Sequence, residues 1–217
     1  MNRRKNKFLF WILWTLSIGF PWFIFVFPGL KIRNLNIISW YEIWQILGRL
    51  LFPCFMIGLL VSVAQYLLLK NQLNFSRAWI IYSILGYTFV PPITMCMIIT
   101  IFGLVYPETL STRGIHFLSV PLDLTMIFSG LLVGIIQLPA FPKKDIENTG
   151  KSIPWLWVLG SSLAWGLGFL VSSFRYDSLR FESMLSGLTI GMITGGVFIL
   201  IDYQANKMMD DSQQKEV

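Results

Sequence analysis

Long apolar stretches of about 20 residues alternate with short polar segments along this chain, and an α-helix of that length crosses the hydrocarbon core of a bilayer. None of the stretches carries a charge near its middle. Arg49, Asp123 and Asp202 lie close enough to an end to reach the lipid headgroups. The sequence therefore predicts an all-α polytopic membrane protein, a single transmembrane domain over residues 1–217, with six spans: Phe8–Phe27, Leu47–Leu69, Trp79–Phe102, Val120–Leu138, Trp155–Phe174 and Met184–Tyr203.

The composition is unlike that of a soluble domain. Charged residues make up 13% of the chain and hydrophobic residues 55%, whereas soluble domains carry about 25% charged residues. The net charge is +6, but the positive residues lie at the N-terminus and between the spans. Because they form no basic stripe, no nucleic-acid partner is expected. The first apolar run ends at Pro28-Gly29 without a small-residue cleavage pattern, which predicts a retained helix.

The distribution of Lys and Arg predicts that both termini are cytoplasmic, because cytoplasmic loops carry the excess of these residues. With the N-terminus inside, eleven fall on the cytoplasmic side and five in the outer loops, leaving aside Arg49 at the outer end of a span. The cytoplasmic set is Arg3, Arg4, Lys5, Lys7, Lys70, Arg77, Lys143, Lys144, Lys151, Lys207 and Lys215. The outer set is Lys31, Arg33, Arg113, Arg175 and Arg180.

Three of the predicted spans share a short pattern. Residues 58–65 read GLLVSVAQ, residues 130–137 read GLLVGIIQ, and residues 187–194 read GLTIGMIT. Small residues four positions apart let another helix approach closely, and a polar residue on or beside the same face can form a hydrogen bond across the contact. Nine residues are thus predicted to pack helices or, alternatively, to line a ligand site: Gly58, Ser62, Gln65, Gly130, Gly134, Gln137, Gly187, Gly191 and Thr194.

The other three spans resemble one another more weakly. Each begins near a tryptophan, and each places a small residue before an aromatic one. The tryptophans are Trp11, Trp79 and Trp155, and the pairs are Gly19-Phe20, Gly86-Tyr87 and Ala164-Trp165. The chain is therefore predicted to contain three tandem helix hairpins, residues 1–72, 73–146 and 147–217. Units that enter and leave on the same side differ from the inverted repeats of many secondary transporters.

Residues 58–87, GLLVSVAQYLLLKNQLNFSRAWIIYSILGY, combine a Gly-rich helix ending in Gln and an aromatic, a basic residue, and a Trp-led helix. Residues 130–144 and 152–169 look like a second copy, in which Leu138-Pro139 replace the aromatic-rich continuation. This pattern resembles a group of uncharacterised polytopic bacterial membrane proteins that is frequent in cyanobacteria. The resemblance supports the repeat and implies no activity.

Few residues are candidates for chemistry. The only histidine, His116, lies in an outer loop near Glu108 and Asp123, where an acid–base or metal role competes with that of a solvated side chain. Cys54 and Cys96 lie inside apolar runs and are predicted to be buried thiols, although a disulfide is conceivable. No His-Glu-x-x-His motif or phosphate-binding loop is present, so no cofactor or metal is expected and an enzyme is disfavoured.

Two classes of function remain. The small-residue strips and the lack of buried charge favour a non-catalytic membrane scaffold or accessory subunit that acts through helix–helix contacts. Its expected partners are the lipid bilayer and other membrane protein subunits or further copies of the chain. The alternative is a transporter, channel or substrate-binding subunit for a weakly polar ligand. That function predicts a cavity near Gln65, Gln137 and Thr194.

Overall fold

A computed structural model describes residues 3–25, 40–70, 77–105, 119–141, 152–172 and 178–214. These ranges are almost entirely helical, as predicted. The α-helices are α1 (Arg3–Phe25), α3 (Trp40–Lys70), α4 (Ala78–Val105), α6 (Ser119–Gln137), α8 (Ser152–Ser172) and α9 (Leu179–Gln214). A short 3-10 helix, η2 (Leu138–Ala140), continues α6.

Five of the helices are long and apolar enough to cross a membrane, which is consistent with a multi-pass membrane protein. The apolar segments are Lys7–Phe25, Leu47–Lys70, Ala78–Ile98, Pro154–Ser172 and Leu179–Gln204. In the remaining helix the apolar segment is the shorter Thr125–Ala140, which includes η2.

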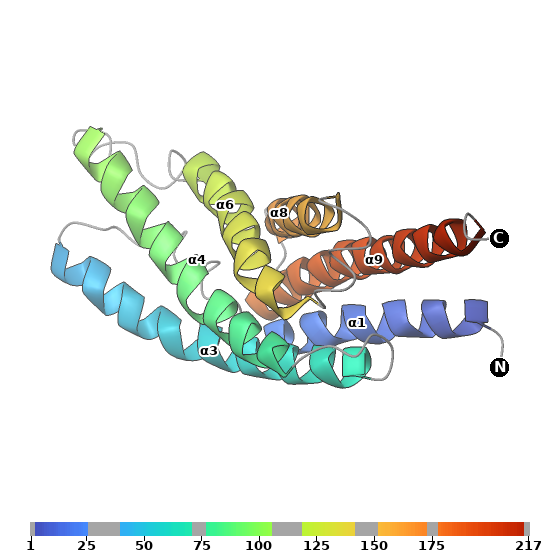
Figure 1. Cartoon of the computed structure of the whole chain (residues 1–217). Coiled ribbons are helices and arrows are strands. Elements are labelled where there is room, and N and C mark those ends of the chain that lie inside the picture. The colour runs from blue at the N-terminus through green and yellow to red at the C-terminus, as the bar shows by residue number, and fades with distance from the viewer. Residues whose placement is uncertain are drawn as a thin grey trace.

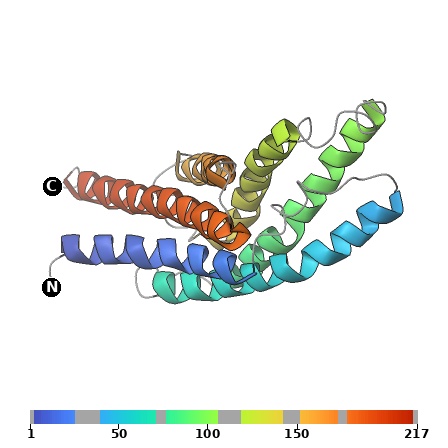
Figure 2. The same cartoon turned by 180° about the vertical axis from the view of Figure 1, so that it is seen from behind.

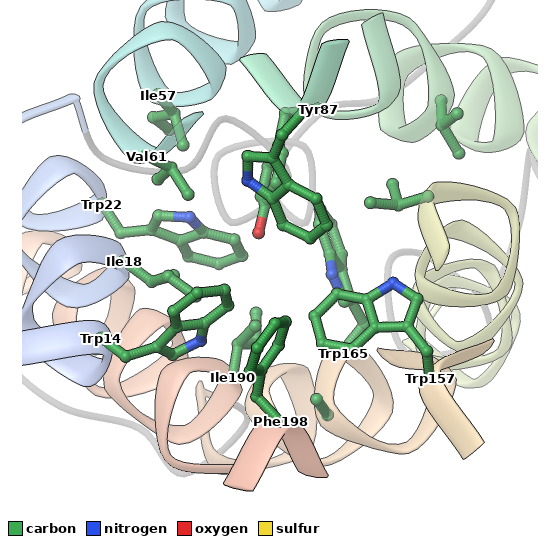
Figure 3. Packing of buried hydrophobic residues seen from close by; sticks show 14 of the residues in the cluster. Trp14, Ile18, Trp22, Ile57, Val61, Tyr87, Trp157, Trp165, Ile190 and Phe198 are labelled. Carbon is green, nitrogen blue, oxygen red and sulfur yellow. The ribbon is translucent and has the colours of Figure 1, made fainter. Parts of the chain in front are cut away.

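The helices form a closed ring in chain order. α1 contacts α3, α3 contacts α4, and the sequence of neighbours continues through α6, α8 and α9. The ring closes because α9 packs along α1, over a more extensive contact than α1 makes with α3. Figures 1 and 2 show α1 and α9 side by side, with both ends of the chain at the same end of the molecule. The view in Figure 3 shows side chains from the surrounding helices converging on the centre.

Many large apolar side chains, aromatic ones included, face outward, whereas many polar side chains are buried inside the ring. Phe20 on α1, Phe52 on α3 and Leu163 on α8 are 63%, 65% and 62% exposed. By contrast, Ser62, Gln65, Ser83 and Gln137 are buried. This arrangement suits a lipid solvent, because hydrocarbon accommodates apolar side chains while buried hydroxyls and amides need partners inside the protein.

Candidate functional site: the aromatic centre of the ring

Three tryptophans meet at the centre of the ring. They are Trp14 on α1, Trp79 on α4 and Trp157 on α8, each 0–2% exposed. The ring centroids are 6.3 Å apart for Trp14 and Trp79, 6.4 Å for Trp14 and Trp157, and 5.7 Å for Trp79 and Trp157. These separations lie within the range in which aromatic rings attract one another. We call this group the tryptophan triangle.

Two phenylalanines, Phe141 and Phe198, each pack against two tryptophans of the triangle. Phe141, just after η2, lies 5.9 Å from Trp79 and 5.6 Å from Trp157 between ring centroids. Phe198 on α9 lies 5.2 Å from Trp14 and 5.8 Å from Trp157. The phenylalanine rings are themselves stacked at 6.2 Å. At this level the centre of the ring is therefore filled with aromatic side chains.

A second aromatic level lies farther along the same three helices. Trp22, Tyr87 and Trp165 each follow a triangle residue by eight positions, which corresponds to about 12 Å of helix. The ring centroid of Trp165 lies 5.7 Å from that of Trp22 and 5.5 Å from that of Tyr87. Figure 3 shows these three side chains reaching inward from α1, α4 and α8. Two aromatic levels thus occupy the interior of the ring.

Two indoles of the triangle donate hydrogen bonds to the polar residues that end the small-residue strips. Trp157 Nε1 donates to Gln137 Oε1 at 3.2 Å, and Gln137 Nε2 donates to Ser83 Oγ at 2.9 Å. Trp14 Nε1 donates to Thr194 Oγ1 at 3.0 Å. Because Gln137 and Thr194 are 2% and 4% exposed, these bonds satisfy polar groups that cannot reach water.

The strip on α6 faces α8 at very short range. A Cβ added to Gly130 would lie 2.5 Å from the carbonyl oxygen of Ser161 and 2.7 Å from Trp165 Cβ. A Cβ added to Gly134 would lie 3.1 Å from Val158 Cα. The absence of a side chain at Gly130 and Gly134 is what allows the backbones of the two helices to approach so closely.

The strips on α9 and α3 face their neighbours in the same way. A Cβ added to Gly187 would lie 2.9 Å from Trp22 Cβ, and one added to Gly191 would lie 2.7 Å from Thr15 Cα. A Cβ added to Gly58 would lie 2.9 Å from Tyr87 Cβ. The pairs α3–α4, α6–α8 and α9–α1 therefore share one contact pattern, in which a strip glycine packs against an aromatic residue of the second level.

The structure describes only some of the other candidates from the sequence. His116 and Glu108 fall outside the described residues, and Asp123 falls in α6. Cys54 and Cys96 are both free thiols. Among the residues that the structure describes, no three His, Cys, Asp or Glu side chains gather as a metal ion would require.

Of the three tryptophans that the sequence pattern grouped, only Trp79 belongs to the triangle. Trp155 is 63% exposed, and Trp11 donates to the carbonyl of Met192 at 2.9 Å. Their places at the centre are taken by Trp157 and Trp14. Phe20, predicted as the counterpart of Tyr87 and Trp165, is 63% exposed, and Trp22 lies in its place. The missed signal is the eight-residue spacing of Trp14–Trp22, Trp79–Tyr87 and Trp157–Trp165.

No family model, curated protein or solved structure matches this chain.

Proposed function

We propose that this chain is a non-catalytic integral membrane scaffold or accessory subunit that works through helix–helix contacts. The observation that carries the proposal is the filled centre of the ring, where Trp14, Trp79 and Trp157 contact one another. Aromatic packing of this kind stabilises a rigid body. A rigid body with an apolar outer surface is well suited to hold other membrane helices in place.

The outward side chains are the ones that meet partners. Gly130 and Gly134 pack on α8, so these strip residues hold the ring together and are covered within the chain. Phe20, Phe52 and Leu163 point outward and are more than 60% exposed. A scaffold of this design therefore binds a second membrane protein through part of its lipid-facing surface.

The proposal includes six spans with both termini in the cytoplasm. α6 supports the sixth span, because it lies between α4 and α8 in the ring and its apolar segment extends to Ala140. The excess of Lys and Arg in the predicted cytoplasmic segments supports the orientation. A reporter that fluoresces only in the cytoplasm, fused after residue 217, should be bright. The same reporter placed between residues 106 and 118 should be dark, and the reverse pattern would refute the orientation.

Three tandem hairpins with a common ancestry are also part of the proposal, as is membership of the bacterial group that the sequence resembles. The shared contact pattern of α3–α4, α6–α8 and α9–α1 supports the repeat. In each pair, a helix that ends one hairpin packs on a helix that begins another. The repeats would therefore be joined around the ring by equivalent contacts.

Site-specific photocrosslinking in native membranes tests the partner surface. A photoreactive amino acid replaces one outward residue at a time, for example Phe20, Phe52, Phe128 or Leu163, and Ser83 serves as an inward control. The expected result is a discrete protein adduct from positions on adjacent helices and none from the control. Adducts with lipid alone from every outward position would contradict the scaffold proposal.

Solute flux tests the alternative, a transporter, channel or substrate-binding subunit for a weakly polar ligand. Vesicles that contain the purified chain should take up glycerol no faster than empty vesicles, because aromatic rings fill the centre of the ring. A double variant, Trp79→Ala with Trp157→Ala, removes two of these rings, and Trp155→Ala is the outward control. Uptake by the unaltered chain above the empty-vesicle rate would support the alternative instead.

A further inference from the structure

The small-residue strips end in a polar residue whose role differs among the three helix pairs. Gln137 accepts a hydrogen bond from Trp157, and Thr194 accepts one from Trp14. Gln65 occupies the same place on α3 and is 2% exposed, but its Oε1 receives no hydrogen bond from Trp79 or from any other residue that the structure describes. A buried carbonyl oxygen in that state calls for a donor that the described residues do not supply.

The strip on α3 also differs in its middle residue. The strips on α6 and α9 have Gly134 and Gly191 there, whereas α3 has Ser62, which is fully buried. Ser62 Oγ donates to the carbonyl oxygen of Gly58, so its lone pairs remain available to accept. The helix pair that lacks the indole bond is thus the one whose strip carries an additional hydroxyl.

Ser62 and Gln65 lie on one face of α3. Residues three apart are neighbours on a helix surface. A long side chain leans back toward the preceding turn, which brings the Gln65 amide toward Ser62. Gly58, at the start of the same strip, faces α4 with an added Cβ 2.9 Å from Tyr87 Cβ. The two acceptors therefore lie along the contact between α3 and α4.

We propose that Gln65 Oε1 and Ser62 Oγ form a binding site for one small, neutral hydroxyl donor, a water molecule or the hydroxyl of an amphiphile. The donor is neutral because the Gln65 amide and the Ser62 hydroxyl carry no charge, and a buried cation without an anionic partner is strongly disfavoured. It is small because α3 and α4 are in close contact at Gly58. Binding there supplies the hydrogen bond that Trp157 and Trp14 supply elsewhere.

Thermal unfolding of the purified chain tests the site. The change in Tm caused by Gln65→Leu has opposite signs depending on whether Gln65 Oε1 has a bound donor or none. If a donor is bound, Gln65→Leu lowers Tm by an amount comparable to the loss from Gln137→Leu. If Gln65 is empty, Gln65→Leu removes an unsatisfied carbonyl and raises Tm. Gln65→Met serves as a second variant in case leucine does not fit. A raised Tm for both would overturn the proposal.

A double-variant cycle tests the shared donor. Ser62→Gly reproduces the residue of the other two strips. Its effect on Tm should shrink once Gln65 is replaced, because the same donor contacts both side chains. The matching cycle of Gln65→Leu with Trp79→Phe should give additive effects. Strong coupling between Gln65 and Trp79, equal to that between Gln137 and Trp157, would identify the Trp79 indole as the donor and would contradict the proposed site.

Unfolding in a detergent without hydroxyl groups, with and without an added amphiphile, distinguishes water from an amphiphile as the source of the hydroxyl. The chain is unfolded in an amine-oxide detergent that has no hydroxyl group, with and without added monoacylglycerol. If water is the donor, Gln65→Leu lowers Tm equally in both conditions. If an amphiphile is the donor, monoacylglycerol raises the Tm of the unaltered chain and leaves Gln65→Leu unchanged. A raised Tm for Gln65→Leu in both conditions would exclude either donor.

Discussion

Glycine residues on the same protein differ widely in what an added methyl group would meet. At Gly130 the new atom would lie 2.5 Å from a backbone oxygen of α8, whereas at Gly196 it would meet nothing within 4 Å. Both positions are inside helices, so the effect of alanine on helix propensity is similar at the two. The difference between the two variants therefore isolates the cost of forcing two helix backbones apart.

Gly130→Ala is expected to destabilise the fold by about 1–3 kcal/mol, the usual cost of overpacking a close contact. The matched variant Gly196→Ala is expected to leave stability unchanged or slightly raised. Thermal unfolding in detergent, followed by the loss of the monodisperse peak in size-exclusion chromatography, measures both. Equal behaviour of the two variants would show that the α6–α8 contact is looser than described.

The hydrogen bonds in the centre of the ring can also be tested, by double-variant cycles. The bond from Trp157 to Gln137 should give a coupling of about 0.6–2 kcal/mol in a cycle of Trp157→Phe and Gln137→Leu. Equilibrium unfolding in mixed micelles provides the free energies. Trp155→Phe is the control, because Trp155 is 63% exposed and should not couple to Gln137. Zero coupling for Trp157 would contradict the assigned bond.

At the scale of elements, α1 and α9 are joined at one end by an ion pair. Lys7 Nζ lies 2.7 Å from Asp202 Oδ2, with side chains 35% and 27% exposed. Partly exposed pairs contribute little. Asp202→Asn should therefore cost no more than about 1 kcal/mol, with a smaller loss in 1 M salt, where the screening length is about 3 Å. Unfolding at low and high salt measures this cost. A large loss of stability that does not depend on salt would show that Asp202 contributes more than this ion pair.

Hydropathy predicts where these helices lie along the chain but not which face of each turns inward. In water, the polar face of a helix identifies its outer side. In lipid, both faces are apolar, so Trp155 and Trp157 look equivalent although only Trp157 faces the centre. The sequence pattern therefore grouped Trp11 and Trp155 with Trp79, whereas Trp14 and Trp157 are the residues that contact Trp79 in the structure. The small-residue strips could be predicted from the sequence, because Gly and Gln differ clearly in size and polarity from the apolar residues around them.

On the scale of the whole molecule, the ring has no free edge. Within the described part of the chain, each α-helix packs mainly against two others, and α9 provides the second neighbour of α1. Both aromatic levels are built from side chains of α1, α4 and α8, and one other helix lies between each two of these around the ring. Removing one helix would therefore uncover two contact surfaces and unpack part of the centre. The molecule is expected to unfold as one unit.

Closure of the ring by its first and last helices has a consequence for synthesis. Trp14 and its acceptor Thr194 are 180 residues apart, and a ribosome adds about 5–20 residues per second. α1 therefore waits roughly 10–40 seconds in the bilayer before its partner emerges. During that interval its inward face is open to insertion factors, lipids or the last helix of a neighbouring nascent chain. Copies made side by side on one messenger RNA can exchange α9, giving swapped oligomers whose α1–α9 contacts match those of the monomer.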